Sequence, residues 1–187
     1  VLEEIAELLT AGDIITHCFN GKPNRILSAQ GELKAAVSQA LARGVTLDIG
    51  HGSASFSFAV ARQAIARGIL PDTISSDIYC RNRLHGPVHS LAHVMSKFLA
   101  LGMTLPQVIA CVTTQAAAAL RLSGKGALTP GSDADLTIFS VNQETRPFTD
   151  AEGEQVAGEH HFLPVAVTVA GQWHLTEEGK RHHVFSV

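Results

Sequence analysis

The chain has 187 residues, of which 45% are hydrophobic, and this suffices for one core and a small second unit. A net charge of -3 and an aromatic content of 5% argue against a surface that binds nucleic acid. No apolar run is long enough to cross a membrane and the three cysteines form no close pair, so we expect a cytoplasmic protein with reduced thiols.

The first two-thirds of the sequence alternate between short apolar strands and helices. A helical start over residues 1–9 precedes strands predicted at about 13–18, 45–50 and 72–78 and helices predicted at about 31–43 and 56–67. Gly44 and Gly68 follow the two helices at the position that favours a left-handed backbone. Continuously apolar strands separated by helices indicate a buried parallel sheet.

The alternation stops after Asp77. A loop that contains Gly86 and Pro87 is expected to open a helix over about 88–101, and another helix follows Thr104. From residue 124 the pattern becomes strand-like at 135–139 and 165–171, and we interpret the polar stretch 142–161 between them as a loop. We therefore expect an α/β part over residues 1–123 and a small β element over residues 124–187.

Three polar side chains stand where the predicted strands end. His17 and His51 follow the first two strands, and Asp77 follows the third. Because the carboxyl ends of strands converge on one face of a parallel βα barrel, these side chains are expected to meet there. Two imidazoles and a carboxylate can hold a divalent metal ion and manage a water bound to it. Taken singly, each residue would more readily be an ordinary polar group at a strand-to-loop junction.

Four segments of the sequence resemble one known family, in the expected order. They are residues 15–21 (ITHCFNG), 48–53 (DIGHGS), 71–77 (PDTISSD) and 124–136 (GKGALTPGSDADL). The first three resemble the metal-binding strand ends of the amidohydrolase superfamily, and more narrowly those of its dihydroorotase-like deacetylase branch. The fourth is similar to the segment with which these enzymes re-enter a β-sandwich. The resemblance implies an α/β fold: the carboxyl-terminal part of a (β/α)8 TIM-type barrel, followed by a small β-sandwich element.

The same resemblance implies a metal-dependent hydrolase that cleaves a C–N amide bond, or a related ester, of a small-molecule substrate with metal-activated water. One or two divalent ions, usually zinc, would be bound. By resemblance, His17 and His51 would hold the second metal, and Asp77 would touch the first metal and accept a proton from the bridging water. Two further residues are candidate substrate contacts: His85, in the loop beyond Asp77, and Gly52, where the backbone could closely approach a ligand.

Two parts of the family's metal centre are absent from this sequence: the His-x-His pair of the first strand and the mid-barrel lysine that bridges two ions. The chain thus resembles the carboxyl-terminal part of such an enzyme. Two alternatives to a deacetylase stay open, namely a catalytically incompetent fragment or scaffold and a cyclic amide hydrolase of the dihydroorotase kind. We expect a missing amino-terminal half or another copy of the chain to cover the barrel edge, and the isolated chain to be inactive.

The other histidines are interpreted as structural. His89 and His93 have the i, i+4 spacing of a zinc clamp, but no glutamate accompanies them, and we expect a solvated or loop-facing pair. The adjacent pairs His160–His161 and His182–His183 are expected at the surface of the β element.

Overall fold

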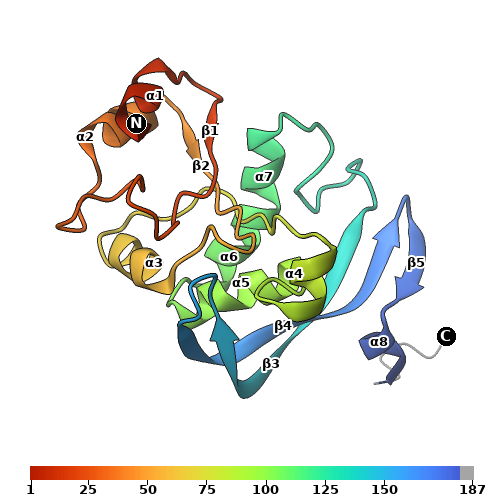
Figure 1. Ribbon diagram of the computed structural model, residues 1–187. Helices are drawn as coiled ribbons and strands as arrows, with labels where there is room; N and C mark the ends of the chain where they lie inside the picture. Colours follow the sequence, from red (N-terminus) through yellow and green to blue (C-terminus); the bar gives the residue numbers. More distant parts are fainter. Residues whose placement is uncertain (182–187) are drawn as a thin grey trace.

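The computed structural model describes residues 1–181 (Figure 1), so the pair His182–His183 lies outside the described residues. The helices are α1 (Leu2–Leu8), α2 (Ala35–Ala42), α3 (Phe58–Ile65), α4 (Cys80–His85), α5 (Leu91–Ala100), α6 (Leu105–Val112), α7 (Thr114–Ala119) and α8 (Glu177–Arg181). The strands are β1 (Ile14–Ile15), β2 (Thr46–Leu47), β3 (Leu136–Thr149), β4 (Gln155–Val169) and β5 (Gln172–Leu175).

Three neighbouring segments run parallel in the amino-terminal part of the chain. β1 and β2 pair in parallel register. Beyond β2 the chain runs beside residues 73–76, where the amide of Ile49 donates to the carbonyl of Thr73 at 3.1 Å and that of His51 donates to Ser75 at 3.2 Å. The predicted third strand is therefore an extended segment that is hydrogen-bonded to the second. Its carboxyl end lies beside those of the other two, as the sequence predicts.

The carboxylate of Asp48 ties these three segments together. Hydroxyl groups of Thr16, Thr73 and Ser75 each donate a hydrogen bond of 2.7 Å to it. The residue is only 7% exposed, and a hydrogen bond to a charged acceptor is worth about 1.5–3 kcal/mol. This buried acceptor fixes the relative positions of the strand ends that carry the predicted site.

The predicted helices are present but shorter. α2 and α3 are followed by Gly44 and Gly68 at φ +96 and +75, which confirms the left-handed positions. The helix predicted from residue 88 begins at Leu91, because the side chain of Ser90 accepts a backbone hydrogen bond from the first turn and so caps it. Pro87 lies ahead of that helix, and the segment before it forms α4 where a loop was predicted. None of the helices within residues 1–181 is long and apolar enough to span a bilayer.

The prediction of a loop over residues 142–161 is wrong. β3 and β4 pair antiparallel through most of this stretch, and β5 pairs with the other edge of β4. Polar residues of β3 are largely exposed, whereas Phe148 and Phe162 point into the core. Cross-strand pairing and one buried face therefore suffice to form the hairpin despite its polar composition.

The tip of this hairpin is joined to the α/β part. Within the turn, the carboxylate of Asp150 accepts hydrogen bonds from the amides of Glu152 and Glu154. It also accepts one from the amide of Phe58, the first residue of α3, at 2.8 Å. In Figure 1 the long hairpin lies on one side of α4–α6, while β1 and β2 lie on the other. Phe148 and Phe162 belong to the same hydrophobic core as α3 and α5.

Candidate active site at the strand ends

The predicted ligands stand at the ends of the three parallel segments. His17 and Asp77 have φ values of +57 and +47. Residues other than glycine rarely adopt this left-handed conformation, which costs about 1–3 kcal/mol and is common at functional sites. His17 is half-buried, Asp77 is exposed and His51 is fully buried. The backbone thus turns at two of the three positions just where a strand ends.

The ring of His17 lies over Gly50. Its Nδ1 donates to the carbonyl of Gly50 at 2.6 Å, and a Cβ placed on Gly50 would lie 2.6 Å from that nitrogen. This bond puts the proton of the neutral imidazole on Nδ1 and leaves Nε2 as the basic atom. Histidines that bind metals are held in this way, by a bond from one ring nitrogen to a carbonyl. His17 therefore has the tautomer that a ligand needs.

The carboxylate of Asp77 lies over Gly52 in a similar way. A Cβ on Gly52, whose φ is +51, would overlap Oδ2 of Asp77. The glycines on either side of His51 therefore make room for the side chains of His17 and Asp77. The close backbone approach that the sequence suggested at Gly52 is made here by a side chain of the chain itself.

As a test of whether the strand-end site is catalytic in the complete protein, we predict that Gly52→Ala lowers turnover by about 10–100-fold, because the new methyl group displaces the Asp77 carboxylate. Gly68→Ala is the matched control, since Gly68 also has positive φ (+75) but has nothing within 4 Å of an added Cβ. Both variants should lose about 1 kcal/mol of stability from backbone strain. Steady-state kinetics and thermal unfolding of the pair separate the two effects. Equal turnover in the two variants would contradict the placement of Asp77.

His51 is engaged by a buried lysine that the sequence did not single out. Its Nδ1 donates to the carbonyl of Gly52 at 2.9 Å, and its Nε2 accepts a hydrogen bond of 2.7 Å from Nζ of Lys97. Lys97 also donates to the carbonyls of Pro87 and Thr149, both at 2.7 Å. The only signal in the sequence is a lysine on the apolar face of α5.

Burial sets the charge states of this pair. Burial, followed by the charge of Lys97, lowers the pKa of His51 to about 3, so its imidazole is neutral near pH 7. Burial lowers the pKa of Lys97 to about 7, against an opposing effect of the Asp150 carboxylate. The neutral imidazole can therefore accept the hydrogen bond that Lys97 donates.

These residues meet the needs of a divalent ion in part. His17 and Asp77 offer a free basic nitrogen and an exposed carboxylate at adjacent strand ends. The basic nitrogen of His51, by contrast, is bonded to Lys97. Within residues 1–181, no group of three or more His, Cys, Asp or Glu side chains is arranged to hold an ion. The donor types fit a metal, and the position of Lys97 opposes the participation of His51.

His85 lies at the end of the helix that follows Asp77 along the chain. It is the exposed last residue of α4 and lines a cavity of about 400 Å³ together with Pro87, His89, His93 and the hairpin tip. His89 precedes α5 rather than lying in it, and its ring packs edge-on against that of His93 at 5.0 Å. His89 is exposed as predicted, whereas His93 is half-buried against Phe148.

We predict that the protein loses stability in acid partly through His93. Burial, then the charges of Lys97, His89 and His51, lower the pKa of His93 to about 3. The unfolded chain takes up this proton near pH 6.5, so the stabilisation is present above that pH and is lost as the pH falls towards 3. The loss amounts to roughly 5 kcal/mol at most. In His93→Phe, the free energy of unfolding measured with urea should fall less steeply as the pH is lowered across this range than it does in the unmodified protein. An equal dependence on pH in the two proteins would contradict the assignment.

The sequence of this chain is similar to those of known enzymes over most of its length. The amidohydrolase family model matches residues 54–173, a range that includes Asp77 and begins after His17 and His51. A deacetylase of Enterococcus faecalis is 43% identical over 91% of this chain and 47% of its own length. Deacetylase Atu3266 of Agrobacterium fabrum is 40% identical over 81% of this chain and 37% of its own length. The chain thus spans half or less of the length of these curated relatives.

Two solved structures are similar over 94% of this chain and 48% of their own chains. The crystal structure of an adenine deaminase superposes with a TM-score of 0.91 at 42% identity. That of a dihydroorotase superposes with a TM-score of 0.82 at 37% identity.

Proposed function

This chain belongs to the amidohydrolase family, and we propose that it carries part of the active site of a metal-dependent hydrolase that cleaves non-peptide C–N bonds. The observation that carries the proposal is the packing of His17 and Asp77 over the two glycines that flank His51. Removal of an acyl group from a small N-acyl or O-acyl compound is the favoured reaction, since three curated relatives that are 40–43% identical over 81% or more of this chain are named deacetylases.

The fold proposed for the chain follows from its parallel segments. Residues 1–123 would form the carboxyl-terminal part of a (β/α)8 barrel, and residues 124–187 would belong to a flanking β-sandwich. The three adjacent parallel segments and the separate antiparallel sheet support this division. Within residues 1–181, β1 pairs with β2 alone, so its other edge is available for a further strand. A missing amino-terminal half or a second copy of the chain would cover that edge.

We assign His17, His51 and Asp77 as ligands of a divalent ion, and zinc suits this set of imidazole and carboxylate donors. When bound, such an ion lowers the pKa of water and polarises the carbonyl under attack. The residues of the chain supply the remaining functions. Gly50 holds the His17 ring with Nε2 free, and the side chains of His17 and Asp77 pack against the two glycines that flank His51.

Asp77 would move the proton. Its carboxylate accepts a proton from the attacking water and delivers it to the nitrogen that leaves when the C–N bond breaks. The exposed position of Asp77 at the end of the third segment gives substrate and solvent access to it. Gly52, directly beneath Asp77, and His85, at the neighbouring cavity, are assigned as contacts to the small-molecule substrate. The three free cysteines support a reducing, cytoplasmic location.

One alternative reaction has its own support. Similarity to a dihydroorotase structure at a TM-score of 0.82 favours opening of a cyclic amide, which requires the same attack and the same proton transfer. A catalytically incompetent scaffold is the other alternative, supported by the engagement of His51 with Lys97.

Metal analysis and hydrolysis assays on one set of variants test the proposal. The complete protein, with the segment that closes the barrel, should contain a divalent ion and hydrolyse N-acetylated amino acids in preference to dihydroorotate. His17→Ala should remove the ion and the activity, and His160→Ala, at an exposed histidine on β4, should change neither. Preference for dihydroorotate would select the cyclic amide reaction. Bound metal without hydrolysis of either compound would select the scaffold, and unchanged metal in His17→Ala would remove the ligand assignment.

A further inference from the structure

A second cavity lies between α5 and the β3–β4 hairpin. Its volume is about 390 Å³, and it shares His89 and His93 with the cavity that contains His85. Ligand pockets for small molecules begin at about 300 Å³, so the space admits a compound with a single ring. None of the residues assigned to the strand-end site lines it.

His161 of β4 lines this cavity with both ring nitrogens unpaired. The residue is 5% exposed, so the predicted surface position is wrong: α5 packs along β4 and covers it. Neither Nδ1 nor Nε2 has a hydrogen-bond partner, and within residues 1–181 no other side chain has two such buried atoms. An unpaired buried polar group costs about 1–3 kcal/mol. Such a group facing a cavity points to a ligand that completes its hydrogen bonds.

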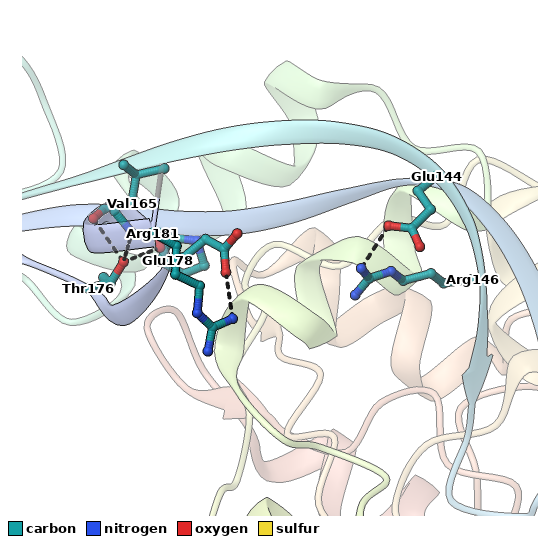
Figure 2. Close-up of polar contacts among 8 residues, drawn as sticks. Glu144, Arg146, Val165, Thr176, Glu178 and Arg181 are labelled. Carbon is teal, nitrogen blue, oxygen red and sulfur yellow. Dashed lines mark hydrogen bonds and ion pairs between the residues drawn. The ribbon is translucent and has the colours of Figure 1, made fainter. Parts of the chain in front are cut away.

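Arg146 of β3 brings a positive charge to the same cavity. Its Nη2 donates to Oε2 of Glu144 at 2.7 Å, as Figure 2 shows. A guanidinium has five donors in a planar fork, so this one bond leaves capacity for a second acceptor. Burial, then the charge of Arg146, lowers the pKa of His161 against the opposing Glu144 carboxylate. His161 therefore offers one N–H donor and one lone pair at neutral pH.

Apolar side chains form much of the remaining wall. Phe148 and Phe162 are buried members of the core, and Leu163 and Pro164 continue the same surface along β4. Ser96 is already satisfied, since it donates to the carbonyl of Ala92 and accepts from the amide of Phe162. A ligand that fits therefore has an acceptor group at one end and an apolar body.

We propose that this cavity binds a small monocarboxylic acid with a single-ring or branched apolar body. Its carboxylate accepts hydrogen bonds from the guanidinium of Arg146 and from the N–H of His161. The body lies against Phe148 and Phe162. A carboxylate suits this pair of donors because the guanidinium fork matches its two oxygens. This site is separate from the proposed hydrolytic site and does not depend on bound metal.

Calorimetric titration with benzoate and with benzamide tests the proposal. The two probes share a ring and differ in charge, so benzoate should bind at least about tenfold more tightly, as expected for one charge-assisted hydrogen bond. Arg146→Met and His161→Phe should each weaken benzoate binding by at least about tenfold. Arg181→Met is the matched control, because Arg181 forms a similar ion pair with Glu178 at α8, outside the cavity (Figure 2).

The proposal would be overturned by no benzoate binding at millimolar concentration, by equal binding of benzamide, or by undiminished binding in Arg146→Met. Arg146 is exposed, so Arg146→Met should keep the fold. This variant therefore still tests the site if His161→Phe fails to fold. Loss of binding in Arg181→Met as well would show that benzoate responds to general surface charge, which would also overturn the proposal. Circular dichroism spectra of each variant establish that the fold is retained.

Discussion

In the complete protein, replacement of Asp77 by Asn is expected to lower turnover by about 10²–10⁴-fold, the contribution typical of a general base. Asn preserves the shape of the side chain but does not accept a proton at neutral pH. The fold should persist, because the hydrogen bonds that hold the local backbone do not involve the Asp77 carboxylate. Nδ2 of Asn82 donates to the backbone carbonyl of Asp77 at 3.0 Å, and Oδ1 of Asn82 accepts from the amide of Tyr79.

Steady-state kinetics and metal content of the Asp77→Asn variant provide the measurement. Asp133→Asn is the control, since Asp133 is an exposed partner of Lys125 in a loop far from the strand ends along the chain. The control should keep full turnover. A kcat close to that of the unmodified protein in Asp77→Asn would exclude Asp77 as the proton acceptor, whereas loss of the ion would assign it chiefly as a ligand.

The strand ends could be predicted because they depend on local sequence and one simple rule. Short apolar runs, each closed by a polar residue, gave the positions of His17, His51 and Asp77, and parallel packing brings such ends to one edge. The left-handed glycines after α2 and α3 were equally accessible, since helix termination is local. Which strand neighbours which follows from the order of the chain and from short connections.

The surroundings of His51 could not be predicted in this way. Lys97 reaches His51 across 46 residues of sequence, and its remaining bonds go to carbonyls whose positions depend on tertiary packing. Every residue has a backbone carbonyl, so the sequence does not indicate which carbonyls accept these hydrogen bonds. A buried lysine is uncommon because its charge must be desolvated, so position on an apolar helix face gives only a weak signal.

The β3–β4 hairpin was misread for a different reason. Its polar residues suggested a loop, yet strand pairing satisfies the backbone whatever the side chains, and exposed polar residues suit the open face. His161 was expected at the surface of the β element together with His160, but its burial depends on α5 lying alongside β4. Both features arise from contacts between distant parts of the chain.

Removal of the Lys97 ammonium should raise the affinity of the strand-end site for a divalent ion by about 10–100-fold. Below pH 7, where most of the Lys97 amine is protonated, an ion that uses Nε2 of His51 must displace a hydrogen bond of 2.7 Å from this charged donor. Such a bond contributes about 1.5–3 kcal/mol, which corresponds to roughly that gain in affinity. Lys97→Met keeps the length of the side chain but leaves the carbonyls of Pro87 and Thr149 without this donor, at a cost of about 1–3 kcal/mol each, so circular dichroism should establish that the variant folds.

Titration with Co²⁺, followed by its visible absorption bands, measures both affinity and coordination by imidazole. Ser96→Ala is the control, because Ser96 is the buried neighbour of Lys97 in α5 and its bonds go to Ala92 and Phe162. It should bind as the unmodified protein does. In the double variant Lys97→Met, His51→Ala the gain should vanish, since His51 is then absent. If Lys97→Met binds no more tightly than the unmodified protein, and His51→Ala no more weakly, His51 is a core residue held by Lys97. The ligand set would then consist of His17 and Asp77 alone among the three assigned residues.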